Sequence, residues 1–156
     1  MSDEQDLQAI LRRRITVDGC MCFNLRKASR AVTQVYDEFL RSGGLRTTQF
    51  SLLAMLVGKG PMPIRTLADY MVMDRTTLTR NLKLVEREGL VTVRAGEDRR
   101  TRIVEITEKG RDAIRHALPF WQEAQDFMVR ELGSKTWAAL QANLGDTISA
   151  TQTTND

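Results

Sequence analysis

A short segment of the chain concentrates side chains that can bind the phosphates and base edges of DNA. It begins at Asp74 and reads Arg75-Thr76-Thr77-Leu78-Thr79-Arg80-Asn81-Leu82-Lys83. Arginine can bind guanine through two hydrogen bonds, and threonine hydroxyls contact bases or phosphates. Threonine is a mediocre helix former, so helix propensity alone does not explain three threonines so close together. The candidate DNA-binding residues of this segment are Arg75, Thr76, Thr77, Thr79, Arg80 and Lys83.

A second candidate contact follows about twenty residues later, at Asp98-Arg99-Arg100. Two arginines on a protruding turn suit a narrow minor groove, where the negative potential is enhanced. Asp98 would repel phosphate, so we expect it to orient a neighbouring arginine or to close the turn. A hairpin tip that is merely soluble would also carry such residues, and that alternative stays open.

The charge distribution favours the same region. The formal net charge is only +3, but ten of the 23 Lys and Arg residues lie between Arg75 and Arg111, against six Asp and Glu. Positive charge concentrated in one quarter of a chain is the pattern that a phosphate backbone selects. A winged-helix module that binds protein instead of DNA is the rival interpretation, and this clustering argues against it.

The periodicity of apolar residues predicts the elements that position these side chains. Four helices are expected first: Cys22 to Leu40, a second from about Thr47 with that residue as its N-cap, Ile64 to Met71, and a fourth from the N-cap Asp74 to about Glu88. Leu78, Leu82 and Val85 form the buried stripe of the fourth helix, which leaves its arginines and threonines outside. Alternating residues from Leu90 to Arg94 and from Arg102 to Ile106 then predict a β-hairpin with a basic tip.

Two further helices complete the predicted order. Thr107 caps the first, which Pro119 should kink or divide, and Trp137, Leu140, Leu144 and Ile148 form the stripe of the last. The fold class is therefore mainly α with a small β-hairpin wing. It is a winged helix-turn-helix at 47–106, flanked by dimerisation helices at 20–42 and 107–150, within a single domain 1–156. The outer helices have no long partner in the chain, so a second copy is the simplest partner, although the stripe could fold back onto its own core.

Several classes of function are excluded or disfavoured. No apolar run approaches the roughly 18 residues that span a bilayer, and the acidic start lacks the pattern of a signal peptide, so we expect a cytoplasmic protein. One histidine, His116, and two close cysteines make a poor structural zinc site. We find no phosphate loop or nucleophile motif and expect neither an enzyme nor a bound cofactor or metal.

These residues resemble the MarR family, the multiple antibiotic resistance regulators. The similarity lies in Asp98-Arg99-Arg100 followed by Ile106-Thr107 and Gly110, and in Ile64-Arg65-Thr66-Leu67-Ala68 and Leu78-Thr79-Arg80-Asn81-Leu82 before them. The resemblance covers roughly Cys20 to Ile148. It implies a homodimer that binds a pseudo-palindromic operator, usually as a repressor. It also implies release by a small phenolic or other anionic effector bound between the dimer region and the DNA-reading helices.

A finer similarity concerns Cys22. The segment Cys22-Phe23-Asn24-Leu25-Arg26-Lys27-Ala28-Ser29-Arg30 is similar to the first helix of the organic hydroperoxide regulators of this family. There the cysteine reacts with peroxide, and Tyr36 lies where a helper tyrosine would fall. Arg26 and Thr47 depart from that pattern, since those regulators carry further tyrosines there. Cys22 is thus the redox candidate, either reactive at a helix N-terminus or inert at a dimer interface.

Overall fold

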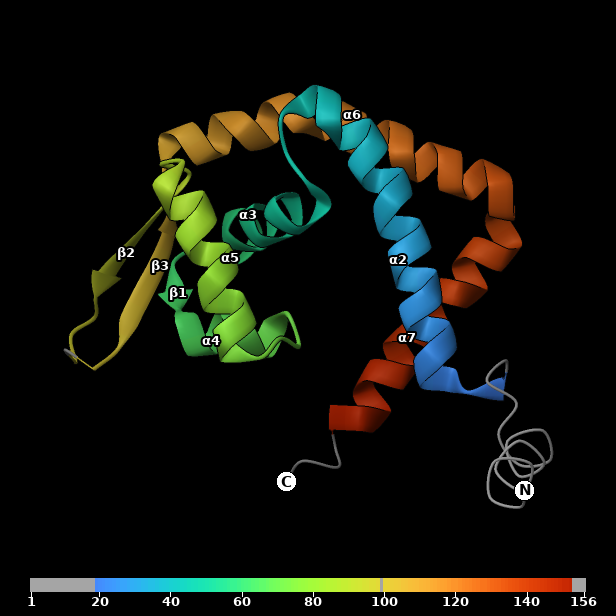
Figure 1. Ribbon diagram of the computed structural model, residues 1–156, viewed down its shortest axis with the longest axis horizontal. Helices are drawn as coiled ribbons and strands as arrows, with labels where there is room; N and C mark the ends of the chain where they lie inside the picture. Colours follow the sequence, from blue (N-terminus) through green and yellow to red (C-terminus); the bar gives the residue numbers. More distant parts are fainter. Residues whose placement is uncertain (1–18, 99, 153–156) are drawn as a thin grey trace, which may run out of the picture.

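The computed structural model of the protein describes residues 19–98 and 100–152. Three long helices form an outer frame, and three shorter helices with a small sheet form a compact head at one end (Figure 1). The frame consists of α2 (Met21–Leu40), the short η2 (Arg41–Gly43), α6 (Glu108–Leu132) and α7 (Ser134–Gln152). The head consists of α3 (Thr47–Lys59), β1 (Met62–Pro63), α4 (Ile64–Tyr70), α5 (Arg75–Arg87), β2 (Val91–Ala95) and β3 (Arg102–Ile106).

The core of the head lies between its helices and its sheet. Leu53 of α3, Leu67 of α4, Leu78 of α5 and Val104 of β3 are each fully buried, with no exposed surface. These are the positions at which the helical and alternating patterns placed apolar residues, since one stripe of each helix must turn away from water. The predicted order of helices and hairpin is confirmed.

The sheet contains one more strand than the sequence predicted. The strands are antiparallel in the order β1-β3-β2. Val91 pairs with Ile106 at the base of the β2–β3 hairpin, and Met62 of β1 pairs with Val104 on the other side of β3. The third strand, β1, is only two residues long, and its pairing joins the entry to α4 directly to the wing.

Helix α6 connects the head to the rest of the frame. It runs without interruption through Pro119, so the helix is not divided there. Trp121 of α6 stacks on Phe50 of α3, with ring centroids 5.7 Å apart. Gly43, after α2, approaches Ala117 so closely that an added Cβ would lie 2.8 Å from the Ala117 Cα. These contacts fix α6 against both the head and α2.

The start of α3 differs from the prediction in one respect. Thr47 is the first residue of the helix and not its N-cap. Asp37 of α2 accepts hydrogen bonds from the Thr47 backbone N–H and from its hydroxyl, both at 2.7 Å. A carboxylate from the preceding helix therefore satisfies the helix terminus that the threonine alone was expected to satisfy.

The last helix is not buried within the chain. None of the 19 residues of α7 is buried, and Leu140 and Ile148 are 39% and 47% exposed. The N-terminal turns of α2 also expose large apolar side chains, with Met21 67% and Phe23 38% exposed. The frame therefore presents apolar surface at the end away from the head (Figure 1).

Candidate nucleic-acid interface

The N-terminus of α5 is held by Asp74. Its side chain accepts a hydrogen bond from the Thr77 backbone N–H at 2.9 Å, which is the standard arrangement of a helix N-cap. Hydrogen bonds from Thr77, through its side chain first and then its backbone, lower the pKa of Asp74. Thr77 is half-buried beside this cap, so its backbone and hydroxyl stabilise the helix start.

The two faces of α5 divide as predicted. Leu78, Leu82 and Val85 are at most 2% exposed. The opposite face is exposed and consists of Arg75, Thr76, Thr79, Arg80 and Lys83, which line a shallow groove of about 400 Å³. The Thr79 hydroxyl donates to the Arg75 carbonyl at 2.7 Å, which leaves its oxygen able to accept from a ligand.

A larger cleft joins this face to the wing and to the start of α4. Its volume is about 520 Å³. Arginines enter it from three separate elements: Arg65 from α4, Arg75 from α5, and Arg100 and Arg102 from the wing. None of these four makes an ion pair with a carboxylate within residues 19–98 and 100–152. The cleft is thus lined by uncompensated positive charge, which suits a phosphate ligand.

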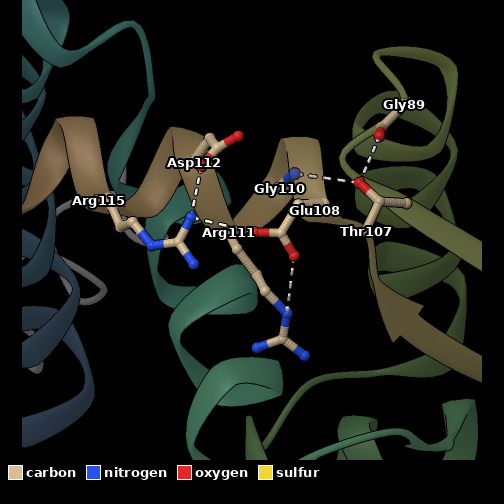
Figure 2. A network of polar contacts seen from close by, with 7 residues as sticks. All are labelled: Gly89, Thr107, Glu108, Gly110, Arg111, Asp112 and Arg115. Atoms are coloured by element: carbon tan, nitrogen blue, oxygen red, sulfur yellow. Dashed lines mark hydrogen bonds and ion pairs between the residues drawn. The ribbon is translucent and has the colours of Figure 1, made fainter.

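The arginines of α6 are arranged differently. In Figure 2, Arg111 and Arg115 both turn back to carboxylates of their own helix. Arg115 donates to Glu108 at 3.1 Å and also to Asp112, and these hydrogen bonds raise the pKa of Arg115. The contrast shows that the arginines in the cleft are unpaired although other arginines of the same fold have partners.

The wing tip is closed by Asp98. Its carboxylate accepts from the Arg100 backbone N–H at 2.9 Å, and its carbonyl accepts from the Thr101 N–H at 2.8 Å. The expected turn-closing role of Asp98 is therefore observed. Arg99 lies outside the described residues.

The base of the wing is fastened to α6. The Thr107 hydroxyl accepts from the Gly110 N–H at 3.0 Å and donates to the Gly89 carbonyl at 2.7 Å, as Figure 2 shows. The Lys109 ammonium donates to the Glu88 carbonyl, also at 2.7 Å. The C-terminus of α5 and the N-terminus of α6 are consequently bound to each other directly.

The redox candidate lies far from this interface. Cys22 is in the first turn of α2, and both Cys20 and Cys22 are exposed free thiols. Tyr36 is fourteen residues further along the same helix, about 21 Å away, and its hydroxyl donates to Gln125. Within one chain, Tyr36 therefore does not contact Cys22.

No group of three or more potential metal ligands occurs in the described part of the chain. None of the described helices combines the length and hydropathy needed to cross a bilayer.

The fold and the basic cleft define a winged helix-turn-helix protein of the DNA-binding transcriptional regulators, and comparison with known proteins agrees. The MarR family model matches residues 43–101. The DNA complex of the M. tuberculosis transcriptional regulator MosR superposes with a TM-score of 0.79 at 36% identity, covering 88% of this chain and 99% of that one. The chain belongs to the MarR family, whose matched members are transcriptional regulators and not enzymes.

Two Bacillus subtilis proteins are also similar in sequence. The uncharacterised HTH-type transcriptional regulator YwoH is 32% identical over 93 residues, which are 60% of this chain and 68% of YwoH. The organic hydroperoxide resistance transcriptional regulator is 31% identical over 95 residues, which are 60% of this chain and 65% of that protein.

Sequence reasoning missed part of the cleft. Arg65 and Arg102 were not among the candidate DNA-binding residues, yet both line the cleft beside Arg75 and Arg100. The signal for Arg65 was its place directly after Pro63 and Ile64 at a helix start, where a side chain can approach phosphate. Arg102 lies in a predicted strand, where alternate residues face outward, so its position gave no separate indication of a DNA contact.

Proposed function

We propose that the protein is a homodimeric repressor that binds a pseudo-palindromic operator in double-stranded DNA and leaves it when a small effector binds. The exposed face of α5 enters the major groove, and the wing tip, with Arg99 and Arg100, enters the neighbouring minor groove. One observation carries the DNA-binding part: unpaired arginines from α4, α5 and the wing converge on one cleft. Asp98 supports the wing tip and does not itself contact DNA.

The homodimer is supported by the frame. A 19-residue helix with no buried residue, such as α7, gains little from packing within its own chain, where only a few of its side chains, such as Trp137 and Leu144, are half-buried. Exposed apolar side chains of α2 and α7 lie on the same end of the molecule. A second copy that covers them would place two α5 helices on one duplex, as operators with two half-sites require.

The first experiment is selection of bound duplexes from a random pool at roughly physiological ionic strength, where non-specific binding is weak. We expect an inverted repeat with half-sites about one helical turn apart. Arg100→Ala should then weaken operator binding by about 1–3 kcal/mol. It should also reduce the slope of log affinity against log salt concentration by about one, the value for one lost phosphate contact. Arg115→Ala is the matched control, since it removes an arginine that is paired on α6.

Other results would contradict parts of the proposal. Equal affinity of Arg100→Ala and the unmodified protein would remove the wing from the interface. Binding to nucleic acid that does not change with salt would favour a protein-interaction module instead. For the dimer, Ile148→Asp should give a monomer in sedimentation, while Val57→Asp, at a similarly exposed position of α3, should not.

For the effector we propose a small phenolic or anionic molecule bound between the dimer helices and the head, as the family resemblance implies. Control by oxidation of Cys22 is the second candidate. It is supported by the exposure of Cys22 and by the 31% identity to the organic hydroperoxide resistance regulator. Peroxide should release operator DNA from the unmodified protein but not from Cys22→Ser. Release that persists in this variant would exclude Cys22, and Cys20→Ser measures what the neighbouring thiol contributes.

A further inference from the structure

A groove between α2 and α6 differs in character from the clefts that face the proposed DNA site. It has a volume of about 360 Å³, within the range of small-molecule sites. It contains no basic residue, whereas arginines and lysine dominate the other two clefts. Its principal lining residues are three phenyl rings, one aliphatic side chain and two carboxylates: Phe39, Phe120, Phe127, Val35, Glu38 and Glu123.

The phenyl rings offer electron-rich faces. Phe39 and Phe127 come from opposite helices, with ring centroids 5.7 Å apart and planes tilted by 48°. The faces of such rings carry partial negative charge and attract cations. The Phe127 ring already has a cation near it, because the Arg130 guanidinium carbon lies 5.4 Å from its centroid. Arg130 itself is 3.6 Å from Glu131, and because this ion pair is exposed it offsets the charge of Arg130 only in part.

The carboxylates add charge of the same sign. Glu38 lies on α2 and Glu123 on α6, one on each wall of the groove. Neither forms a hydrogen bond or an ion pair with any residue in the described part of the chain. An apolar surface with two uncompensated carboxylates attracts a cation with an apolar body and repels an anion.

We propose that this groove binds a small organic cation that carries an aromatic or aliphatic body, such as an aryl-substituted quaternary ammonium. The rings would pack on the apolar part, and the carboxylates with the ring faces would hold the positive charge. Such a ligand is distinct from the anionic effector expected at the junction with the head, because Glu38 and Glu123 disfavour an anion here.

The groove does not coincide with the proposed dimer surface at the start of α2. Leu25, in the first turns of α2, is ten residues from Val35, whereas the exposed Val32 is only three residues from it. At about 1.5 Å per residue, these residues lie about 15 Å and about 4.5 Å from Val35 along the helix. The groove therefore adjoins the exposed apolar face of α2, and it remains open when a second copy packs only on the N-terminal half of that helix.

Ligand binding in the groove would also shift the DNA-reading head, and this step alone rests on the proposed function. Next to the groove, Gly43 touches Ala117, and α6 is bonded to the end of α5 through Thr107 and Lys109. A ligand that separates α2 from α6 would displace α6 and, with it, α5.

The test uses the full-length protein without DNA and benzyltrimethylammonium as the probe, with binding followed by calorimetry and chemical-shift titration. Its uncharged isostere neopentylbenzene and the anion phenylacetate are the comparison ligands. Glu38→Gln and Glu123→Gln should each weaken probe binding about two- to fivefold, as expected for one exposed charge pair. The double variant should weaken it about tenfold. Asp112→Asn, on the same helix and more than two turns from the groove, should leave it unchanged.

Equal affinity for the probe and for neopentylbenzene would overturn the proposal, as would full affinity in the double variant. No binding of the probe at millimolar concentration would overturn it too, and would indicate a groove covered by the second copy. Operator affinity with the probe saturating tests the regulatory step separately, since unchanged affinity removes that step and leaves the site. A protein that binds the probe but no DNA would contradict the proposed function and not the groove.

Discussion

Thr107 is the residue whose replacement tests the connection between wing and frame most directly. Its hydroxyl makes two hydrogen bonds at once, from the Gly110 N–H at 3.0 Å and to the Gly89 carbonyl at 2.7 Å (Figure 2). The first caps α6, and the second fastens α6 to the turn after α5. Thr107→Ala removes both without introducing a larger side chain.

The expected cost follows from these two bonds. Loss of an N-cap costs about 1 kcal/mol of stability, and loss of a further hydrogen bond about another 1 kcal/mol. Thr107 is half-buried, so water can replace part of the second bond and the sum is an upper value. We expect Thr107→Ala to lower the free energy of unfolding by about 1–2 kcal/mol. For a chain of this size that is a decrease in Tm of roughly 3–6 °C.

The assay is thermal unfolding followed by circular dichroism at one fixed protein concentration, because association would make Tm depend on concentration. Thr107→Ser keeps the hydroxyl and should unfold within about 1 kcal/mol of the unmodified protein. Thr107→Val keeps the shape without the hydroxyl and should lose at least as much as Thr107→Ala. If the alanine and serine variants unfold at the same temperature, the hydroxyl does not hold the wing to α6 and the reasoning fails.

Four other substitutions have outcomes that follow from single local features of the structure. Gly110→Ala places a Cβ 2.1 Å from the Leu90 carbonyl oxygen and should lower the free energy of unfolding in urea by about 3 kcal/mol. Gly145→Ala, at an open helical position, should instead raise the free energy of unfolding by up to about 1 kcal/mol. Val72 has φ +47° and is 61% exposed, so Val72→Gly should raise the urea midpoint by relieving about 1 kcal/mol of strain. The pKa of Asp74 is lower in the folded protein than in the unfolded chain. The ionised carboxylate therefore contributes to stability above the pKa of the unfolded state, and this contribution is lost as the pH falls through the pKa of the folded state. Asp74→Ala should therefore destabilise at pH 7, with a deficit that shrinks below about pH 4, and a deficit that does not change between pH 7 and pH 3 would contradict this.

Those parts of the fold that depend on neighbours in the sequence were predicted well. The caps at Asp74 and Thr107 act on residues three positions later, and both were identified from the sequence. The buried stripe of Leu78, Leu82 and Val85 follows from helical periodicity alone. Local rules suffice where the interacting atoms lie within one turn of helix.

The differences arise where distant segments meet. Asp37 caps α3 from ten residues away, and Met62 pairs with Val104 across 42 positions, which no local pattern encodes. Pro119 leaves α6 undivided because its side chain is exposed, so the carbonyl that loses its partner can bond to water. The same reason explains the incomplete cleft: Arg65 and Arg102 are separated by 37 positions and come together only through β1 and β3.

The groove and the DNA-facing cleft are connected by one continuous element, and this connection has a thermodynamic consequence. Helix α6 runs 25 residues without interruption from the base of the wing to the turn before α7. The exposed ion pairs of Arg111 and Arg115 contribute little to the stability of α6, since such pairs are worth little in water. The hydrogen bonds of Thr107 and the close contact of Gly110 with Leu90 hold the start of α6 against the head. If a cation in the groove weakens operator binding by some factor, operator DNA must weaken cation binding by the same factor. Thr107→Ala, which loosens the junction, should reduce both effects together and leave each separate affinity less changed.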